Sequence, residues 1–226
     1  MRRVLTAAFV SLDGVMQAPG GPQEDGEGGF EHGGWTFHHW DEAMRQAIGE
    51  TMARPFDLLL GRKTYDIFAA HWPFAGDDPI AVKFNAATKY VATHEPSTLN
   101  WENSVALTGD IAGEIARIKA QEGHDLLIQG SSQLIQTLLK HDLIDEYGLW
   151  IFPVVLGTGK RFFGTGKRFF GAGALPGNMK LVASKVSTTG VIMTTYRRIG
   201  DVTTGSFALD EPSEEELKRR QKTAAA

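Results

Sequence analysis

The sequence predicts an α/β protein with a mostly parallel central sheet, helices on both faces of that sheet and an antiparallel hairpin at its C-terminal end. Short continuous apolar runs, such as Asp57–Gly61 and Asp125–Gly130, are typical of strands that are buried on both faces. Amphipathic segments separate these runs, and this alternation is typical of parallel sheets. After Asp145 the alternation stops, and the segments 180–187 and 191–198 predict a hairpin that turns around Thr188–Gly190.

The individual elements follow in order along the chain. The first strand is Val4–Val10, and a glycine-rich loop (18–34), too dense in glycine for regular structure, comes after it. Apolar residues recur at helical spacing over Trp40–Ala53, which predicts a helix with one buried face. Asp145 and Glu146 begin a long strand and are interpreted as part of the structural frame. The other expected elements are strands at 57–61, 89–93, 104–107, 125–130 and 146–156, and helices at 64–70, 111–118 and 134–139.

The composition limits the classes of partner. A chain of 226 residues with 42% hydrophobic residues can bury a sizeable core. Its net charge of −4 at pH 7 gives no general attraction to nucleic acid or to anionic membranes. No apolar run approaches the ~20 residues that a membrane-spanning helix needs. We therefore expect a cytoplasmic protein that binds neither nucleic acid nor membrane.

The sequence also argues against a metal site and against thiol chemistry. The chain contains no cysteine, which removes thiol catalysis and cysteine-based metal sites. Three histidines, His32, His38 and His39, lie close together in sequence, but their spacing fits no usual ligand set. We expect them to be solvated loop residues, and we expect no bound metal.

Two segments near the C-terminus stand apart from the alternating pattern. We expect a folded domain over 1–199 and a polar tail over 200–226, either helical or disordered, because the tail is highly charged and has little apolar surface to bury. Within the domain, the heptad GTGKRFF occurs twice in succession over 157–170. We interpret one copy as an insertion in a connecting loop, where added length costs little entropy. The alternative is that its Lys, Arg and Phe side chains line a substrate site or a dimer contact.

Two strand ends carry residues suited to phosphate. Gly61 ends one strand, and Arg62, Lys63 and Thr64 lead from it into a helix. Gly130, Ser131 and Ser132 lie between a later strand and its helix. Glycine allows close approach to the backbone, and the first turn of a helix has free N–H groups that bind anions. Since ligands bind outside the carboxyl ends of parallel strands, the pair predicts a ligand with separated phosphates. Alternatively, Gly and Ser are ordinary residues at a helix start.

Several of these segments resemble one known family. The sequences SLDGVM, LLLGRKTYDIF, KYVATHEP and LLIQGSSQLIQTLLKHDLIDEYGLWIFPVVLGTGKRFF follow in the order seen in the dihydrofolate reductase-like family. They are most similar to the branch related to the reductase domain of the bifunctional riboflavin-biosynthesis protein. The resemblance covers residues 1–199. It implies a dihydrofolate reductase-like fold, NADPH as hydride donor, and a homodimer.

The resemblance also implies roles for matching positions. Residues expected to hold the adenosine-side phosphates are Gly61, Arg62, Lys63 and Thr64, with Thr93 and His94 near the 2′-phosphate. Those expected to hold the pyrophosphate are Gly130, Ser131, Ser132 and Gln133, although this segment departs from the three glycines of dihydrofolate reductases. Those expected to flank the nicotinamide are Ala8, Ser11, Asp13 and Gly14. The basic residues at 62 and 63 favour NADPH over NADH.

A reductase also needs a source of protons. Asp41 falls on the apolar arc of the expected helix Trp40–Ala53, where burial would raise its pKa and allow it to hold a substrate or donate a proton. Asp is also a preferred residue at the start of a helix, so Asp41 is alternatively a cap. Asp13 and water are the other candidates. Trp35, Phe37, Trp40 and Trp72 are candidates for an aromatic wall against a flat heterocycle, or for core packing.

Together these observations predict an NADPH-dependent reductase that transfers a hydride to a small pterin- or aminopyrimidine-like substrate. The deaminase that accompanies this reductase in the riboflavin pathway is not expected here, because a zinc deaminase needs cysteine ligands. The alternative is a nucleotide-binding protein without catalysis, since a fold does not guarantee an activity.

Overall fold

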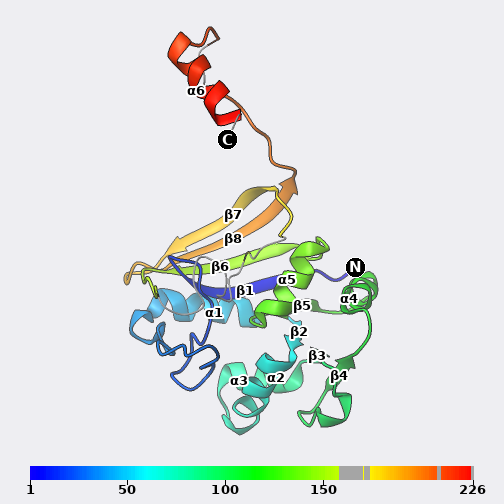
Figure 1. Cartoon of the computed structure of the whole chain (residues 1–226). Coiled ribbons are helices and arrows are strands. Elements are labelled where there is room, and N and C mark those ends of the chain that lie inside the picture. The colour runs from blue at the N-terminus through cyan, green and yellow to red at the C-terminus, as the bar shows by residue number, and fades with distance from the viewer. Residues whose placement is uncertain (158–169, 171–173, 208–209, 225–226) are drawn as a thin grey trace.

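An eight-stranded sheet forms the centre of the computed structural model, which describes residues 1–157, 170, 174–207 and 210–224 (Figure 1). The strand order is β4-β3-β2-β5-β1-β6-β8-β7. Six strands run parallel, while β8 lies antiparallel to both β6 and β7, as the sequence predicts. The strands are β1 (Val4–Ser11), β2 (Phe56–Gly61), β3 (Lys89–Ala92), β4 (Ser104–Leu107), β5 (Asp125–Ile128), β6 (Glu146–Phe152), β7 (Asn178–Val186) and β8 (Ile192–Gly200).

The helices lie close to their expected positions, with four differences. Helix α1 begins two residues later than expected, α2 and α5 each begin two residues earlier, and α3 has no counterpart among the expected elements. Helix α3 follows Asp78, whose carboxylate accepts hydrogen bonds from the backbone N–H groups of Ile80 and Ala81, with Pro79 in the first turn. The helices are α1 (Glu42–Ala53), α2 (Arg62–Ala69), α3 (Pro79–Ala86), α4 (Ile111–Ala120), α5 (Ser132–Lys140) and α6 (Glu214–Ala224).

The sheet is buried on both faces, which explains its continuous apolar runs. In β2, Leu58 and Leu60 pack in one core with Phe84 of α3, whereas Leu59 points to the other face and packs in the core that contains Ile135 of α5. All five side chains are fully buried. Helices α1, α2 and α3 therefore cover one face of the sheet, and α4 and α5 cover the other.

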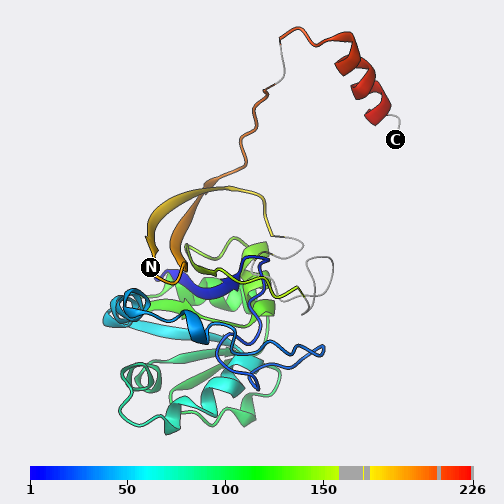
Figure 2. The same cartoon turned by 90° about the vertical axis from the view of Figure 1, so that its left-hand side faces the viewer.

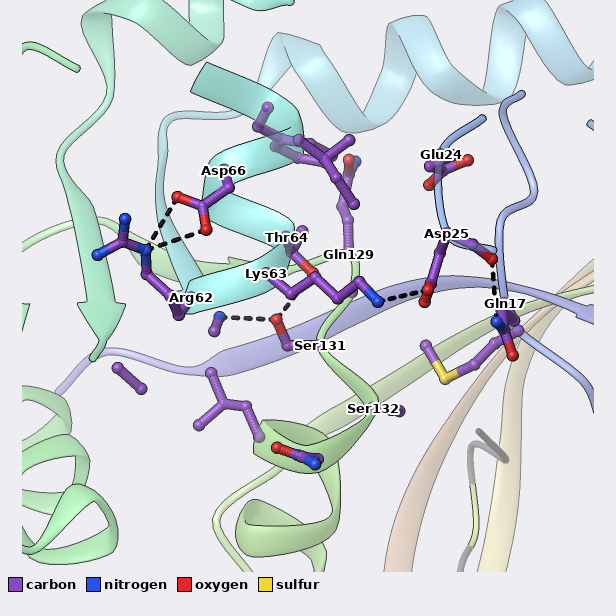
Figure 3. Close-up of a pocket in the computed structure, with 18 of the residues that line it drawn as sticks. Gln17, Glu24, Asp25, Arg62, Lys63, Thr64, Asp66, Gln129, Ser131 and Ser132 are labelled. Atoms are coloured by element: carbon purple, nitrogen blue, oxygen red, sulfur yellow. Dashed lines mark hydrogen bonds and ion pairs between the residues drawn. The ribbon is translucent and has the colours of Figure 1, made fainter. Parts of the chain in front are cut away.

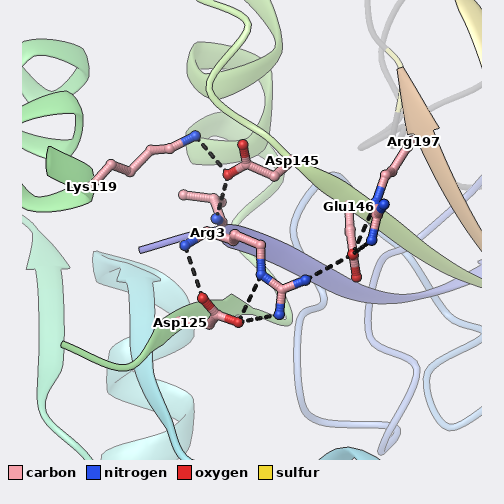
Figure 4. Close-up of polar contacts among 7 residues, drawn as sticks. Arg3, Lys119, Asp125, Asp145, Glu146 and Arg197 are labelled. Atoms are coloured by element: carbon pink, nitrogen blue, oxygen red, sulfur yellow. Dashed lines mark hydrogen bonds and ion pairs between the residues drawn. The ribbon is translucent and has the colours of Figure 1, made fainter. Parts of the chain in front are cut away.

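Charged side chains are paired where the strands begin (Figure 4). The guanidinium of Arg3 contacts the carboxylate of Asp125 and lies 2.9 Å from Glu146, which also binds Arg197. Beside them, Asp145 accepts from the backbone N–H of Val4 at 2.7 Å and forms an ion pair with Lys119 at 2.6 Å. The interpretation of Asp145 and Glu146 as parts of the structural frame is therefore confirmed.

The C-terminal tail contains the helix that its sequence suggests. Helix α6 stands away from the sheet at the end of the segment 201–213 (Figures 1 and 2). Ion pairs within the helix join Glu216 to Arg219 and Arg220. Most of the repeated heptads, 158–169, lie outside the described residues, and the prediction for that loop stays a prediction. None of the described helices is both long enough and apolar enough to cross a membrane.

Candidate functional site

A cavity of about 950 Å³ opens at the carboxyl ends of the parallel strands (Figure 3). Its wall combines the ends of β2, β3 and β5, the first turns of α2 and α5, and part of the glycine-rich loop. Ten of the predicted residues line it: Gly61, Arg62, Lys63, Thr64, Thr93, His94, Gly130, Ser131, Ser132 and Gln133. The two strand ends singled out in the sequence therefore share one cavity, as expected for the crevice of an open α/β sheet.

The two strand ends touch through the hydroxyl of Ser131. This hydroxyl accepts a hydrogen bond from the backbone N–H of Gly61 and donates one to Thr64 Oγ1, and both bonds are 2.8 Å long. A Cβ atom at Gly61 would lie 2.6 Å from the Cβ of Ser131, and one at Gly130 would lie 3.1 Å from Thr64 Oγ1. Both glycines are therefore needed for the close approach of the two segments.

Ser131 has an uncommon backbone conformation for a residue with a side chain. Its φ of 72° and ψ of 81° fall in the left-handed region, and its side chain makes no capping bond to α5. Because the hydroxyl reaches across to Gly61 instead, the first turn of α5 has no side-chain cap from Ser131, and none is seen among the described residues. Uncapped N–H groups at a helix start attract anions, and backbone strain of this kind is concentrated at functional sites.

Arg62 stands at the outer end of the cavity and is held in place by several partners. Its Nε atom donates to Asp66 at 2.9 Å, and its Nη1 atom lies 3.3 Å from the carbonyl of Glu95 and 3.5 Å from Thr93 Oγ1. His94 is exposed and lines the cavity beside them. Arg62, Thr93 and His94 therefore line the same part of the cavity wall, as the resemblance to the reductase family implies.

Lys63 is engaged in a way that the sequence does not suggest. Its ammonium group lies 2.5 Å from Asp25 and 3.0 Å from Glu27, both in the glycine-rich loop (Figure 3). Burial alone would lower the pKa of Lys63, but the two carboxylates outweigh it and raise the pKa above its ordinary value. A phosphate at this position has to share Lys63 with these carboxylates or displace them.

The residues expected beside the nicotinamide do not line the cavity. Ala8 is 1% exposed and packs in the core beneath α5, while its neighbours Ala7 and Phe9 line the cavity from the opposite face of β1. The side chain of Ala8 faces away from the cavity because strand side chains alternate between faces, and its expected place beside the nicotinamide stays a prediction. Gly14 has a φ of +79° and belongs to the turn that follows β1.

Asp13 and Ser11 form a turn that ties β1 to the end of β6. Ser11 Oγ donates to the Asp13 carboxylate at 2.6 Å, and the backbone N–H groups of Leu156 and Gly157 donate to it at 3.2 and 3.1 Å. Burial would raise the pKa of Asp13, but these hydrogen bonds hold it below its ordinary value. The carboxylate is therefore a clamp between two loops and does not line the cavity.

Asp41 acts as a helix cap. Its Oδ1 accepts from the backbone N–H of Met44 at 2.9 Å, and its Oδ2 accepts from the backbone and hydroxyl of Thr188, each at 2.7 Å. Met44 and then Thr188 lower the pKa of this carboxyl. The expectation of a raised pKa is wrong, because the side chain turns back onto the start of α1 instead of entering the apolar face. Asp41 is not among the residues that line the cavity.

Sequence reasoning missed the residues that the glycine-rich loop brings to the cavity. Gln17, Glu24, Asp25 and Glu27 line one wall. Trp72 also lines the cavity, together with Phe9 and Phe68, whereas Trp35 and Trp40 pack with the core around Phe152. The sequence did contain a signal for this wall, because the three acidic residues Glu24, Asp25 and Glu27 lie close together between glycines.

The comparisons with known proteins agree with this geometry. The model of the RibD C-terminal domain matches residues 2–193. The Bacillus subtilis (strain 168) protein YyaP, described as uncharacterized, is 25% identical over 200 residues, which are 86% of this chain and 94% of YyaP. A second protein of that organism, YwjB, also described as uncharacterized, is 26% identical over 165 residues, which are 72% of this chain and 83% of YwjB.

Two solved structures share the fold. A protein from Shewanella sp. PV-4 has 22% identity and a TM-score of 0.57, over 88% of this chain and 99% of its own. The diaminohydroxyphosphoribosylaminopyrimidine deaminase/5-amino-6-(5-phosphoribosylamino)uracil reductase of Thermotoga maritima has 14% identity and a TM-score of 0.54. The match spans 88% of this chain and 57% of that protein.

Proposed function

Because the chain belongs to the RibD C-terminal domain family, we propose that it is an NADPH-dependent reductase of a small, flat heterocycle of the pterin or aminopyrimidine kind. The observation that carries the proposal is the contact between the two strand ends, where Ser131 holds Gly61 and Thr64 beside the uncapped start of α5. This arrangement presents backbone N–H groups and hydroxyls to a ligand with several phosphates.

The described residues fit a phosphorylated dinucleotide. A Cβ at Gly61 would clash with Ser131 and one at Gly130 would press on Thr64, so these glycines let the two strand ends meet in the cavity wall, where Ser131, Ser132 and Gln133 would hold a pyrophosphate. Arg62, with Thr93 and His94, would read the 2′-phosphate, because guanidinium binds phosphate through two parallel hydrogen bonds. When bound, NADPH supplies a hydride, and the chain supplies position, exclusion of water and a proton.

The flat shape of the proposed substrate is supported by the aromatic lining. Phe9 of β1, Phe68 of α2 and Trp72 lie in the wall of the cavity. Aromatic rings stack on flat heterocycles and leave polar groups at the ring edge free for hydrogen bonds. Folate is a less suitable substrate than a pterin or aminopyrimidine, since the family is that of the riboflavin-pathway reductase.

A second candidate is nucleotide binding without catalysis. It is favoured by one observation: Asp41 and Asp13, the two acids expected to assist reduction, both serve as structural clamps outside the cavity. The two candidates share the nucleotide and differ in whether a heterocycle is reduced. Screening pterins and aminopyrimidines for NADPH oxidation separates them, because a binding protein leaves the NADPH absorbance unchanged.

A homodimer is also proposed, through the exposed edge of the sheet. Strand β7 lies at the edge of the sheet and pairs with β8 alone among the described strands, and its side chains Leu181, Val182 and Val186 are exposed. An exposed apolar edge strand is a template for pairing with another chain, and a second copy offers the same strand. Light scattering is expected to give twice the 24.7 kDa chain mass, and Val182→Lys is expected to give the mass of one chain.

The proposed cofactor is tested by titrating the protein with NADPH and NADH and following energy transfer from tryptophan, which includes Trp72 in the cavity wall. We expect NADPH to bind more tightly, and Arg62→Ala to weaken NADPH about tenfold or more while changing NADH little. Arg45→Ala, which removes an exposed guanidinium of α1 paired with Glu42, is the control and is expected to change neither. Equal affinity for both nucleotides in all three proteins would contradict the assignment of Arg62.

A further inference from the structure

The glycine-rich loop is a folded element that closes one side of the cavity. Gln17 Nε2 donates to the backbone carbonyls of Asp25 and Glu27, each at 2.9 Å. The indole N–H of Trp35 donates to the Gln17 carbonyl at 2.8 Å, and the hydroxyl of Thr36 donates to the Pro19 carbonyl at 2.8 Å. These bonds fix both ends of the loop, so its side chains have defined positions.

Two glycines show how tightly this loop is packed against itself. A Cβ at Gly33 would lie 2.7 Å from the Cα of Pro22, and Gly34, with a φ of +81°, donates from its backbone N–H to the Ala18 carbonyl at 2.8 Å. Beneath the loop, Phe30 is buried with Leu156 in a small apolar core. The loop is therefore built to present particular groups to the cavity, and the proposed nucleotide contacts do not account for all of them.

Glu24 is the most distinctive of these groups. Its Oε2 atom accepts hydrogen bonds from the backbone N–H groups of Gly20 at 2.6 Å and Gly21 at 3.2 Å, and the side chain lines the cavity (Figure 3). Burial raises the pKa of Glu24 above its ordinary value; the two N–H groups act in the opposite direction, and Asp25 raises it further. The Glu24 carboxyl is therefore held in a fixed position, and it keeps its proton to a higher pH than an exposed carboxyl does.

The other acids in the wall are already engaged. Asp25 and Glu27 form ion pairs with Lys63 of α2, and Asp66 forms one with Arg62 at the outer end of the cavity. Gln17, which also lines the cavity, adds a second acceptor: the residue is 2% exposed, and its Oε1 atom has no hydrogen-bond partner among the described residues. A wall with such acceptors favours a ligand that carries N–H donors.

We propose that Glu24 is the acid of this site: its carboxyl binds a ring nitrogen or amino group of a flat nitrogen heterocycle and donates the proton when a C=N bond is reduced. The proposal rests on the reductase function proposed above. Reduction adds a hydride to carbon and a proton to nitrogen, and the hydride comes from NADPH. Glu24 gives its carboxyl proton to that nitrogen, becomes a carboxylate, and regains a proton from water. The glycine-rich loop thereby takes the role that the sequence suggested for Asp41.

The test compares Glu24→Gln with Glu31→Gln, which removes an exposed carboxylate of the same loop outside the cavity. Glutamine keeps an acceptor oxygen for Gly20 and Gly21, so the variant is expected to fold, and thermal unfolding checks this. Glutamate labelled with ¹³C at its carboxyl is titrated by NMR. We expect the Glu24 carboxyl to titrate above the ordinary value of 4.5 in the wild type, and we expect its signal to be lost in Glu24→Gln and kept in Glu31→Gln.

Binding of 2,4-diaminopyrimidine is then measured by calorimetry without nucleotide, with pyrimidine as the probe that lacks amino groups. We expect Glu24→Gln to weaken the diaminopyrimidine about tenfold or more, Glu31→Gln to change it less than about twofold, and pyrimidine to bind weakly to all three. Gly20→Ala places a Cβ 3.1 Å from Glu24 Oε2 and shifts the carboxylate without removing it, so an intermediate weakening is expected.

Equal binding of the diaminopyrimidine to the wild type and Glu24→Gln, or a high-titrating carboxyl that survives in that variant, overturns the assignment. The same proteins are titrated with NADPH, which Glu24→Gln is expected to bind as the wild type does. If NADPH fails to bind to the wild type while the Glu24 results hold, the reductase function fails and Glu24 remains a ligand-binding acid. If NADPH binds and Glu24→Gln changes neither readout, the reductase function stands and the role of Glu24 fails.

Discussion

The two ends of the parallel sheet use charge in opposite ways. Where the strands begin, charged groups face opposite charges. Arg3 lies between Asp125 and Glu146 (Figure 4), and Arg2, which is 3% exposed, contacts Asp57. Where the strands end, hydroxyls, backbone N–H groups and the side chain of Arg62 surround a cavity of about 950 Å³ (Figure 3). Where the strands begin, the charged side chains pair with one another, whereas where the strands end, polar groups surround a cavity.

This difference separates structure from function. A buried ion pair compensates the cost of removing its charges from water, and breaking it affects the whole fold. Polar groups around a cavity are instead free to exchange water for a ligand. Lys63 and Arg62 lie between these cases, because both line the cavity and yet form ion pairs, Lys63 with Asp25 and Glu27 and Arg62 with Asp66. We therefore expect substitutions where the strands begin to change stability, and substitutions where they end to change binding.

The largest effect is expected from Asp57→Asn. This change leaves the guanidinium of Arg2 buried without its carboxylate, so we expect the free energy of unfolding to fall by about 3–5 kcal/mol. Urea unfolding measures the loss. Glu42→Gln, which breaks the exposed pair with Arg45, is the control and is expected to cost less than about 1 kcal/mol. Similar losses in both variants would show that burial of the Arg2 pair has no special importance.

The next effect is expected from Gly61→Ala, which tests the other end of the sheet. The added methyl would lie 2.6 Å from the Cβ of Ser131 and must push the two strand ends apart. We expect NADPH affinity to fall at least about tenfold and stability to fall by about 1–3 kcal/mol. The control is Gly49→Ala on α1, where a Cβ meets nothing within 4 Å. This change is expected to raise the free energy of unfolding by about 0.5–1 kcal/mol and to leave the NADPH affinity unchanged. Unchanged affinity in Gly61→Ala would contradict the proposed site.

A smaller effect is expected in the pH dependence of stability. Burial would raise the pKa of Asp125, but hydrogen bonds from Arg3 outweigh it and hold the pKa below the ordinary 3.8. Because the folded pKa is the lower one, this carboxylate stabilises the protein above pH 3.8, and the contribution is lost as the pH falls through the folded pKa.

Asp125→Asn tests this by urea unfolding between pH 7 and pH 3. We expect a loss of about 1 kcal/mol at pH 7 and a shallower decline of stability in acid than in the wild type, since Arg3 is partly exposed. Asp77→Asn, at an exposed position, serves as the control. An equally steep acid decline in Asp125→Asn would show that the pair with Arg3 does not contribute to the pH dependence.

The smallest effect is expected from Glu27→Gln. This exposed carboxylate competes with a phosphate for Lys63, so its removal is expected to tighten NADPH binding by about two- to fivefold. The free energy of unfolding of Glu27→Gln is expected to differ from that of the wild type by less than about 0.5 kcal/mol. Weaker NADPH binding in this variant would show that the carboxylate assists the nucleotide rather than competing with it.

Much of the fold could be predicted from the sequence. Buried strands such as β2 show as continuous apolar runs, and glycines with hydroxyls at strand ends marked Gly61 and Ser131 correctly as parts of one cavity. The direction of single side chains could not be predicted. Asp41 satisfies helical spacing for the apolar face, but a local bond to the Met44 backbone is available to it and sets its direction. Ala8 differs from the cavity-lining Ala7 by one residue of strand register.

The cavity residues that the glycine-rich loop supplies could not be predicted from the sequence for a different reason. Loops lack the periodicity that predicts helices and strands, so nothing in the sequence shows that Gln17 ties the loop together from within. The position of Glu24 depends on that tie and on the backbone of Gly20, both of which only the three-dimensional structure shows. Contacts between segments distant in sequence, such as Lys63 with Asp25, are beyond local patterns in the same way.

A crystal structure of the protein with NADP⁺ would show whether NADPH binds at the end of the sheet where the strands terminate. We expect the pyrophosphate beside Gly61, Ser131 and the start of α5, and the 2′-phosphate within hydrogen-bond distance of Arg62. Nucleotide bound elsewhere on the protein, or none in crystals grown at saturating NADP⁺, would refute the proposed site.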